Sequence, residues 1–459
     1  MALWASQETL LTVDETGAPA PWLATAWEAD PEAKTITFTL RKGVKFHDGT
    51  DFNAEAVKWN LDIFGSEGRV ELKKVESIDI LDDFTVRLNL SEFDALLLNN
   101  LASQRGGFIV SPTAYEKYGR EWCEKHSVGT GPFKFVSWER DVSMKFERFD
   151  DYWQEGKPYL DAFELVVIAD PMVATASFMA GEVDVLADVS PKDARDLEAS
   201  GKYRMSVASA ALSSVLTDSA YPDSIFTDIR LRRAVEYAID KQAICDTIGY
   251  GYWEPLNQAA KPGGWAWNPD VVGYPYNPDK ARELLAEAGY PDGFKTQLHV
   301  LSRPVDIPDS MTAVQGYLAE VGIDADLFLY DRGGAWHAIA AKGGWPTGLC
   351  NFPRGGLDVG ELAIINRFLS PDAFLFASVY REPEYQELLA KAVTAPDFET
   401  QQAMVWEMQK VGTDKYAMIC WHHVVKAMSA RHSQVHDDGF SSAFGYAGQW
   451  TPADAWLEQ

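Results

Sequence analysis

The sequence predicts an α/β protein built from more than one domain. Its 459 residues exceed what one hydrophobic core usually organises, so two or three domains are expected. Between residues 278 and 329, helical and extended patterns alternate, as in the βαβ units of an α/β domain. Nearer the start, a strand pattern of period two leads into a capped helix, which indicates a separate sheet-and-helix unit.

The first of these units is clearest between residues 22 and 61. Residues 35–40 alternate apolar and polar side chains, which predicts a strand with one buried face. His47 and Asp48 precede a glycine, and this favours a turn over a catalytic or metal-binding pair. Asn53 stands at the N-cap position of an amphipathic helix.

In other segments, too, the pattern of neighbouring residues predicts the secondary structure. A helix near 231–238 is expected to bury Leu231, Ala234, Val235 and Ala238. The tail from Met428 onward contains mostly turn-forming residues. Further helices are expected at 4–11, 176–180, 191–198, 278–288, 313–321, 385–393 and 401–411, and further strands at 75–81, 85–90, 133–138, 163–168, 183–186, 298–301 and 323–329.

Composition limits the classes of partner. The net charge is −27, from 41 basic and 68 acidic residues, which argues against nucleic acid or an anionic membrane as the main partner. The four cysteines form no CxxC pair, and buried thiols are favoured over disulfides. No apolar run reaches the length of about 18 residues that would indicate a membrane span, and no secretory signal opens the chain.

Several motifs occur in a characteristic order. Pro21 to Trp27 reads P-x-L-A-x-x-W, and Phe38 to Gly49 reads F-x-L-R-x-G-V-K-F-H-D-G. Later motifs are VGTGPF at 128–133, YW with YLD within 152–161, GEVD at 181–184, and F-x-D-x-R leading to AIDK at 226–241. Together they resemble the signatures of family 5 extracellular solute-binding proteins, the peptide- and nickel-binding receptors of ABC importers.

The resemblance implies a periplasmic-binding-protein-like fold of type II, cluster C, with two lobes and an extra inserted domain. The first lobe would comprise 1–11, 160–258 and 424–459, the inserted domain 12–159, and the second lobe 259–423. Crossings near 255–262 and 420–426 would form the hinge. Family members usually begin with a signal peptide and a first strand, so we expect this chain to be shortened at its N-terminus.

The implied function is capture of a solute, preferably a peptide, by hinge closure and its delivery to a membrane permease. A monomer in the periplasm or outside the cell is expected, with or without a lipid anchor, and with no cofactor, metal or nucleic acid. The resemblance places Ser213 and Ser214 in a strand beneath the ligand. The candidate contacts from the second lobe are Trp265, Trp267, Trp345, Asn351, Phe352, Arg354 and Asp358.

Other solutes and other classes stay open at this point. Dipeptide receptors of the family have a carboxylate-binding arginine near the position of Pro308 and Asp309, where this chain has none, so a sugar, an opine or a metal chelate is an alternative to a peptide. A hydrolase is a further alternative, although no common catalytic motif is present. His422, His423, His432 and His436 are interpreted as surface histidines rather than a metal site.

Overall fold

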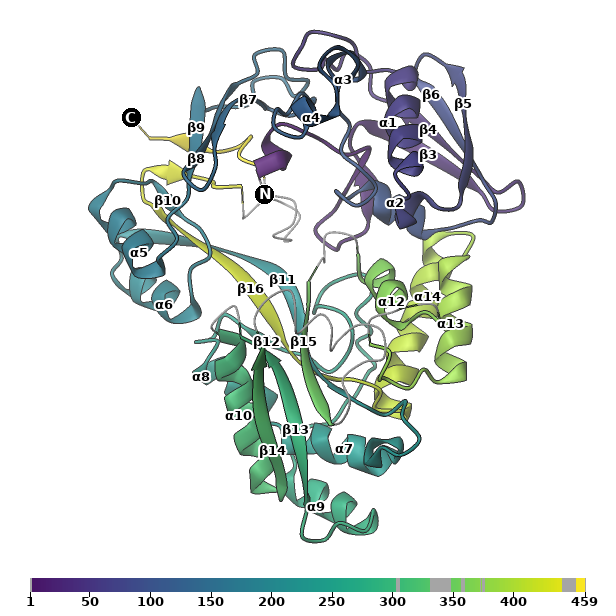
Figure 1. Ribbon diagram of the computed structural model, residues 1–459, viewed down its shortest axis with the longest axis vertical. Helices are drawn as coiled ribbons and strands as arrows, with labels where there is room; N and C mark the ends of the chain where they lie inside the picture. The colour runs from purple at the N-terminus through teal and green to yellow at the C-terminus, as the bar shows by residue number, and fades with distance from the viewer. Residues whose placement is uncertain are drawn as a thin grey trace.

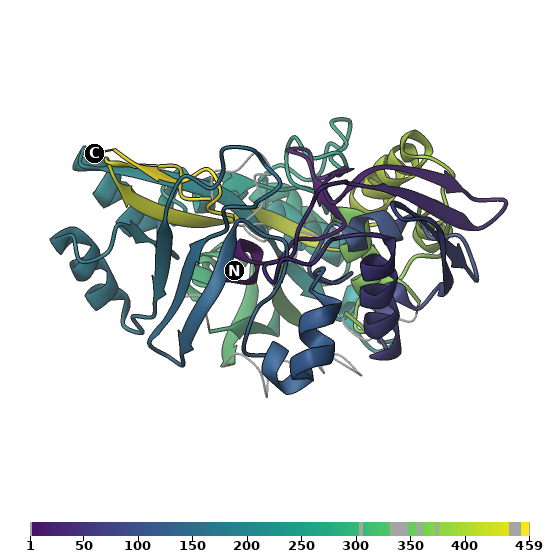
Figure 2. The same cartoon turned by 90° about the horizontal axis from the view of Figure 1, so that it is seen from above.

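The computed structural model describes residues 2–302, 306–330, 348–355, 360–371, 373, 376–439 and 451–458. Figure 1 shows an upper and a lower part of the molecule, and two long strands, β11 (Tyr203–Thr217) and β16 (Cys420–His432), run from one to the other. The two strands pair antiparallel along most of their length, and they remain side by side when the molecule is seen from above (Figure 2).

These two strands belong to a sheet with the order β10-β16-β11-β15-β13-β14, and β12 also pairs with β16. In the lower part, β13 (Phe294–Leu301) pairs parallel with β14 (Ile323–Tyr330) and with β15 (Leu349–Gly355). Helix α10 (Asp306–Glu320) packs on β13 and β14, which completes the predicted βαβ unit. The short strands are β10 (Val185–Leu186) and β12 (Glu254–Pro255).

The upper part contains two smaller antiparallel sheets. One has the order β3-β4-β6-β5, and α1 packs on β5 and β6. Its elements are β3 (Ala24–Asp30), β4 (Thr35–Leu40), β5 (Val75–Asp82), β6 (Thr85–Leu90) and α1 (Ala54–Ser66). The other consists of β7 (Phe133–Glu139), β8 (Ser143–Arg148) and β9 (Ala162–Val166), and it has a small aromatic core of its own.

The remaining elements complete the chain. Two further pairs of short strands are β1 (Leu11–Val13) with β2 (Pro19–Pro21), and β17 (Val435–His436) with β18 (Trp456–Leu457). The helices are α2 (Leu96–Leu101), α3 (Pro112–Tyr118), α4 (Arg120–Cys123), α5 (Pro171–Ala180), α6 (Pro191–Ala199), α7 (Ile229–Ala238), α8 (Lys241–Thr247), α9 (Pro278–Glu287), α10 (Asp306–Glu320), α12 (Glu361–Leu369), α13 (Pro383–Val393) and α14 (Phe398–Lys410). Single turns are the 3-10 helices η1 (Ala2–Ala5), η2 (Val70–Leu72) and η3 (Ile225–Thr227), and Val411–Lys415 is π-helical.

The local sequence signals are confirmed where they are strongest. The apolar residues of β4 are buried, and the Asn53 side chain caps α1 by accepting a hydrogen bond from the backbone N–H of Ala56 at 2.9 Å. The four predicted core residues of α7 are buried as well. Gly181 ends α5 in the left-handed conformation, as a glycine after a helix is expected to do.

Two sequence predictions are wrong. Residues 4–11 do not form a helix, because their backbone pairs with distant segments: the N–H of Ile109 donates to the carbonyl of Glu8, and that of Gly131 to the carbonyl of Ser6. The tail from Met428 does not begin with turns, because β16 extends to His432 and is paired along its length with β11. In both cases a partner far away in sequence decides the conformation.

One cluster of the hydrophobic core contains residues from all three predicted domains. One cluster of buried side chains includes Phe38 and Leu61 of the inserted domain, Leu212 of β11, and Phe352 and Phe368 of the second lobe. A second cluster lies between the lower sheet and its helices. In the part of the chain that the structure describes, no helix has the length and apolar character needed to cross a membrane.

Candidate functional site

The predicted serines lie in a buried polar group where β11 and β15 pair. Ser214 is opposite Phe352 and donates from its hydroxyl to the Phe352 carbonyl at 2.9 Å. The side-chain amide of Asn351 donates to the Ser214 carbonyl at 3.0 Å and to the Ser213 hydroxyl at 3.3 Å. All four residues are buried, and Phe352 packs edge-to-face on Phe376 with ring centroids 4.5 Å apart. The structure therefore brings Ser213, Ser214, Asn351 and Phe352 together.

The adjacent part of β16 corrects the prediction for two histidines. His422 and His423 are buried, not on the surface, and their Nδ1 atoms lie 2.7 Å apart. A bulge explains the contact: Ser213 pairs with His423 and Ser214 with Trp421, so His422 is the extra residue and strand alternation is interrupted. Trp253 stacks on His423 at 4.1 Å.

Both of these rings are neutral. Burial lowers the pKa of His423 to about 3, and burial together with the charge on neighbouring groups lowers the pKa of His422 well below its usual value. In a neutral pair, one Nδ1 donates and the other accepts, which accounts for the short distance. The two histidine rings are therefore packed, neutral side chains of β16.

The two predicted tryptophans lie at the start of the second lobe. Trp265 is buried; its backbone N–H donates to the Thr16 carbonyl at 3.1 Å, and its carbonyl accepts from Trp406 at 2.9 Å. Trp267 is partly buried against the main core. Trp265 therefore links the second lobe to the turn between β1 and β2.

The other three candidates have no described side-chain environment. Trp345 and Asp358 lie outside the described residues. Arg354 belongs to β15 and pairs with Leu212 through the backbone, but its side chain is outside the described part. Immediately before β15, the carboxylate of Asp218 accepts a hydrogen bond from the backbone N–H of Gly348 at 2.9 Å.

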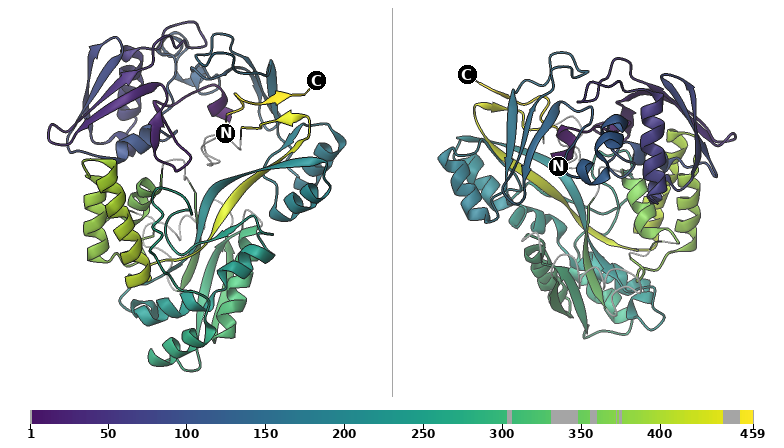
Figure 3. Two further views of the ribbon diagram at one scale, coloured as in Figure 1. Left: turned by 180° about the vertical axis from the view of Figure 1, so that it is seen from behind. Right: turned by 45° about the horizontal axis from the view of Figure 1, so that its top comes forward.

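One contact that the sequence did not predict joins α2, in the predicted inserted domain, to α12 and α13, in the predicted second lobe. Helix α2 packs against α12, and the backbone N–H of Ala95 donates to the Val393 carbonyl at 2.9 Å. Figures 1 and 3 show α2 beside the helices of the second lobe. The only signal in the sequence is that two polar residues, Asn99 and Asn100, interrupt an apolar run, and both are buried.

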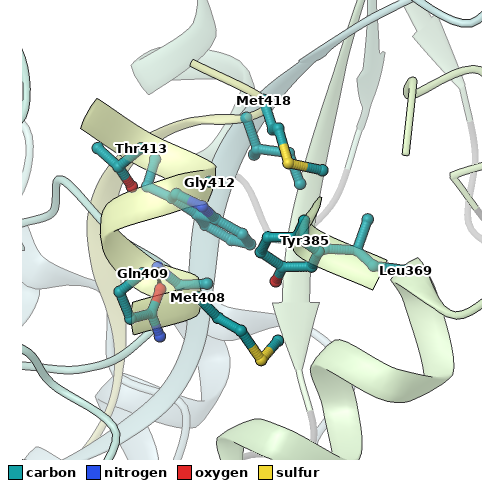
Figure 4. A pocket seen from close by; sticks show the side chains of 10 residues that line it. Leu369, Tyr385, Met408, Gln409, Gly412, Thr413 and Met418 are labelled. Atoms are coloured by element: carbon teal, nitrogen blue, oxygen red, sulfur yellow. Dashed lines mark hydrogen bonds between the residues drawn. The ribbon is translucent and has the colours of Figure 1, made fainter. Parts of the chain in front are cut away.

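One pocket of the second lobe is too small for a solute. It lies between α13, α14, the π-helical turn and the start of β16, and Figure 4 shows Tyr385, Met408 and Met418 directed into it. Its volume is ≈ 10 Å³, which is about the space of a single water molecule. The pocket is a packing defect.

The described residues show no arrangement typical of a metal centre or of a reactive thiol. Among them, no group of three or more histidine, cysteine or acidic side chains is placed to hold a metal ion. Cys245, Cys350 and Cys420 are buried free thiols whose pKa values are raised by burial, so they remain protonated and unreactive. Two parts joined by the long paired strands β11 and β16 are the architecture of a two-lobe protein.

Comparison with known proteins supports this class and identifies the family. Residues 18–375 match the model of bacterial extracellular solute-binding proteins, family 5. The chain is 31% identical over 398 residues to the glutathione-binding protein GsiB of Pectobacterium atrosepticum, covering 84% of this chain and 77% of the relative. It is 33% identical over 338 residues to GsiB of Salmonella typhi, covering 72% of this chain and 65% of that relative. The chain belongs to the family 5 extracellular solute-binding proteins.

Solved structures agree on the fold. NikA from Brucella suis, in complex with Fe(III)-EDTA, has a TM-score of 0.86 at 22% identity and is matched over 100% of this chain and 95% of its own. DppA from Helicobacter pylori, in complex with the peptide STSA, has a TM-score of 0.78 at 23% identity, over 99% and 93%. Both confirm the predicted α/β fold of cluster C.

Membership of the family defines the class of activity. The chain is a substrate-binding protein of the ABC-transporter class, and the family consists of binding proteins, not enzymes. The family is extracellular or periplasmic. The resemblance and the α/β fold predicted from the motifs are confirmed, and the hydrolase alternative is wrong.

Proposed function

We propose that this chain captures a short peptide or a peptide-like solute such as glutathione between its two lobes and delivers it to a membrane permease. The observation that carries the proposal is the identity of 31% to 33% with relatives named for glutathione binding. Delivery to a permease from outside requires an extracellular or periplasmic protein, and the family is extracellular or periplasmic.

Closure requires a hinge, and we propose that β12 and β16 form it. Glu254 and Pro255 pair with Val424 and His423, so the two predicted crossings lie against each other. Lys426 donates from Nζ to Glu254 at 2.6 Å, which links the two crossings by charge as well. A solute that contacts both lobes then favours the closed state by its differential affinity for it.

We propose that the solute is held near the junction of β11, β15 and the start of the second lobe. Ser213, Ser214, Asn351 and Phe352 would act as the rigid base of this region, since they are buried and hydrogen-bonded to each other. Trp265 and Trp267 would supply a neighbouring wall. The remaining candidates of this proposed site are Trp345, Arg354 and Asp358.

Thermal unfolding with a panel of solutes tests the proposed function. We expect glutathione or another short peptide to raise the Tm in a saturable manner, because a ligand that binds only the folded state stabilises it by mass action. Agropinic acid, a monosaccharide and Fe(III)-EDTA serve as the opine, sugar and chelate arms. A shift with one of these three and none with any peptide would replace the peptide by that class.

A further inference from the structure

A hollow lies between helix α1 and strand β5 of the predicted inserted domain, apart from the proposed solute site. Its volume is ≈ 170 Å³, whereas the pocket of the second lobe measures ≈ 10 Å³. Figure 1 shows α1 and β5 in the upper part, while β11, β15 and β16 lie in the middle of the molecule. A cavity of about 150 Å³ holds one benzene molecule, so the hollow has room for a group of that size. Its lining consists of Leu61, Asp62, Gly65, Leu72, Val75, Glu76, Ser77 and Ile78.

The hollow has an apolar wall. Leu61 of α1, Leu72 of η2 and Ile78 of β5 are buried members of the main core cluster, and Val75 is partly buried against it. These side chains come from three different elements, so the wall is part of the folded domain and not of a single loop. An apolar group that enters the hollow is removed from water, which is favourable.

The hollow is open because α1 carries a glycine at this point. Gly65 follows Leu61 by four residues, about one helical turn, so it lies on the same face of the helix. No local geometry requires a glycine there: its φ is not positive, and a Cβ would meet nothing within 4 Å. A glycine within a helix is less stable than an alanine. The open space, and not the backbone, is therefore what this glycine provides.

The rim of the hollow is acidic. Asp62 is paired with Lys58 at 2.8 Å, so one of its two carboxylates is already neutralised. The other, Glu76, is exposed, and within the described part of the chain it forms no ion pair. Glu76 stands between the paired residues Val75 and Ser77, where the register of β5 shifts. Such a bulge redirects a side chain, and here it leaves one negative charge at the rim without a counterion.

The position of β5 in its sheet adds further acceptors. The order β3-β4-β6-β5 makes β5 an edge strand, so in the described part of the chain its outer side has no strand partner. The backbone carbonyls of that side accept hydrogen bonds. An ammonium group has three donors and no acceptor, and it therefore suits a rim of carboxylate and carbonyl oxygens. An anion would be repelled by Glu76.

We propose that this hollow is a second binding site, which takes a small amphipathic cation. An apolar body of about the size of a benzene ring lies against Leu61, Leu72 and Ile78, and an ammonium group is held by Glu76. The site contains no residue of the proposed solute site, so the chain binds this cation together with its solute. The proposal goes beyond the proposed function and does not depend on it.

Titration calorimetry with benzylammonium at neutral pH tests the proposal, and benzyl alcohol and phenylacetate are the neutral and anionic analogues with the same ring. Benzylammonium should bind once per chain. Benzyl alcohol should bind about threefold more weakly, the size expected for one exposed charge interaction, and phenylacetate should not bind. Absence of benzylammonium binding would overturn the site, and equal binding of all three compounds would overturn its selectivity for a cation.

Two variants locate the binding. Gly65→Leu places a side chain in the open space and should abolish it. Gly316→Leu in α10 is the matched control, because that glycine is also helical and exposed and has nothing within 4 Å of its Cβ. Glu76→Gln should weaken binding about threefold. Its control is Glu28→Gln, an exposed carboxylate on β3, the other edge strand of the same sheet.

The variants also decide the outcome independently of each other. Glu76 is exposed, so Glu76→Gln folds even where Gly65→Leu does not. An affinity for benzylammonium that is the same in Glu76→Gln as in Glu28→Gln would overturn the role of the rim. Unchanged binding in a folded Gly65→Leu variant would show that the cation binds elsewhere and would overturn the proposal.

A titration in excess glutathione separates this site from the solute site. Benzylammonium should bind with the same affinity whether or not glutathione is present, and Gly65→Leu should bind glutathione as the unaltered chain does. Displacement of benzylammonium by glutathione would place the cation in the solute site and overturn the second site. Absence of glutathione binding would count against the proposed function alone, because the variants test the second site without it.

Discussion

The carboxylate of Glu8 shows how one residue joins segments that are far apart in the sequence. It is buried and accepts hydrogen bonds from Thr130 at 2.8 Å, Tyr152 at 2.9 Å, Trp153 at 3.0 Å and Trp22 at 2.9 Å. Burial nevertheless raises its pKa to about 7, because the four hydrogen bonds lower it by less than desolvation raises it.

Glu8 predicts a specific dependence of stability on pH. Its pKa is about 7 in the folded chain and 4.5 in the unfolded one, so the folded state binds the proton more tightly. Its contribution to the free energy of unfolding is fully present below about pH 4.5 and is lost as the pH rises through about 7. The loss amounts to about 3 kcal/mol.

The comparison with Glu8→Gln isolates this effect. The variant is less stable overall, because an amide oxygen is a weaker acceptor for four donors, but the Glu8 contribution to the pH dependence disappears. The difference in free energy of unfolding between the two proteins, measured by urea titration at several pH values, should narrow from pH 4.5 to pH 8. A constant difference would contradict the assignment.

At the same scale, the sequence predicts which residues lie together better than it predicts how they are packed. Ser213, Ser214, Asn351 and Phe352 were grouped from a family resemblance, and the structure does place them together. His422 and His423 were misjudged because a bulge cannot be seen in strand alternation.

At the scale of elements, a buried ion pair links α7 and α8. Lys241 donates from Nζ to Glu236 at 2.7 Å, and the side chains of the two residues are only 9% and 2% exposed. Glu236 also contacts Cys420 at the start of β16. The pair thus connects two helices of the lower part with a crossing strand.

Removing one partner of this pair should lower the free energy of unfolding more than replacing both partners with apolar residues. Lys241→Met leaves the Glu236 carboxylate buried without its counterion, which should lower the free energy of unfolding by about 3–5 kcal/mol at neutral pH. In the double variant Glu236→Leu/Lys241→Met, most of that loss should be recovered, because no charge is left buried. Chemical denaturation of both variants checks this. Equal losses in the two would indicate that packing, not charge, dominates.

The elements that were predicted well are those determined by their neighbours in sequence. The α1 helix has its own cap at Asn53, and β4 has its own alternation. The segment 4–11 and the long strand β16 were not recognised, since their conformations depend on pairing with residues more than a hundred positions away. Long-range pairing leaves little local signal.

At the scale of the whole molecule, the parts are more tightly connected than a division into two lobes and an insert suggests. The central sheet continues from β16 and β11 into β15 and β13, and one core cluster extends into the inserted domain. Closure around a solute would therefore occur by bending within paired strands.

The central claim is that this chain binds an intact peptide-like solute and releases it unchanged. A native mass spectrum of the full chain, recorded after incubation with glutathione and a mixture of short peptides, tests it most directly. The account predicts one solute per chain, with a mass equal to that of an added, uncleaved molecule. A spectrum that shows only the unliganded chain, or fragments of the added peptides, would contradict it.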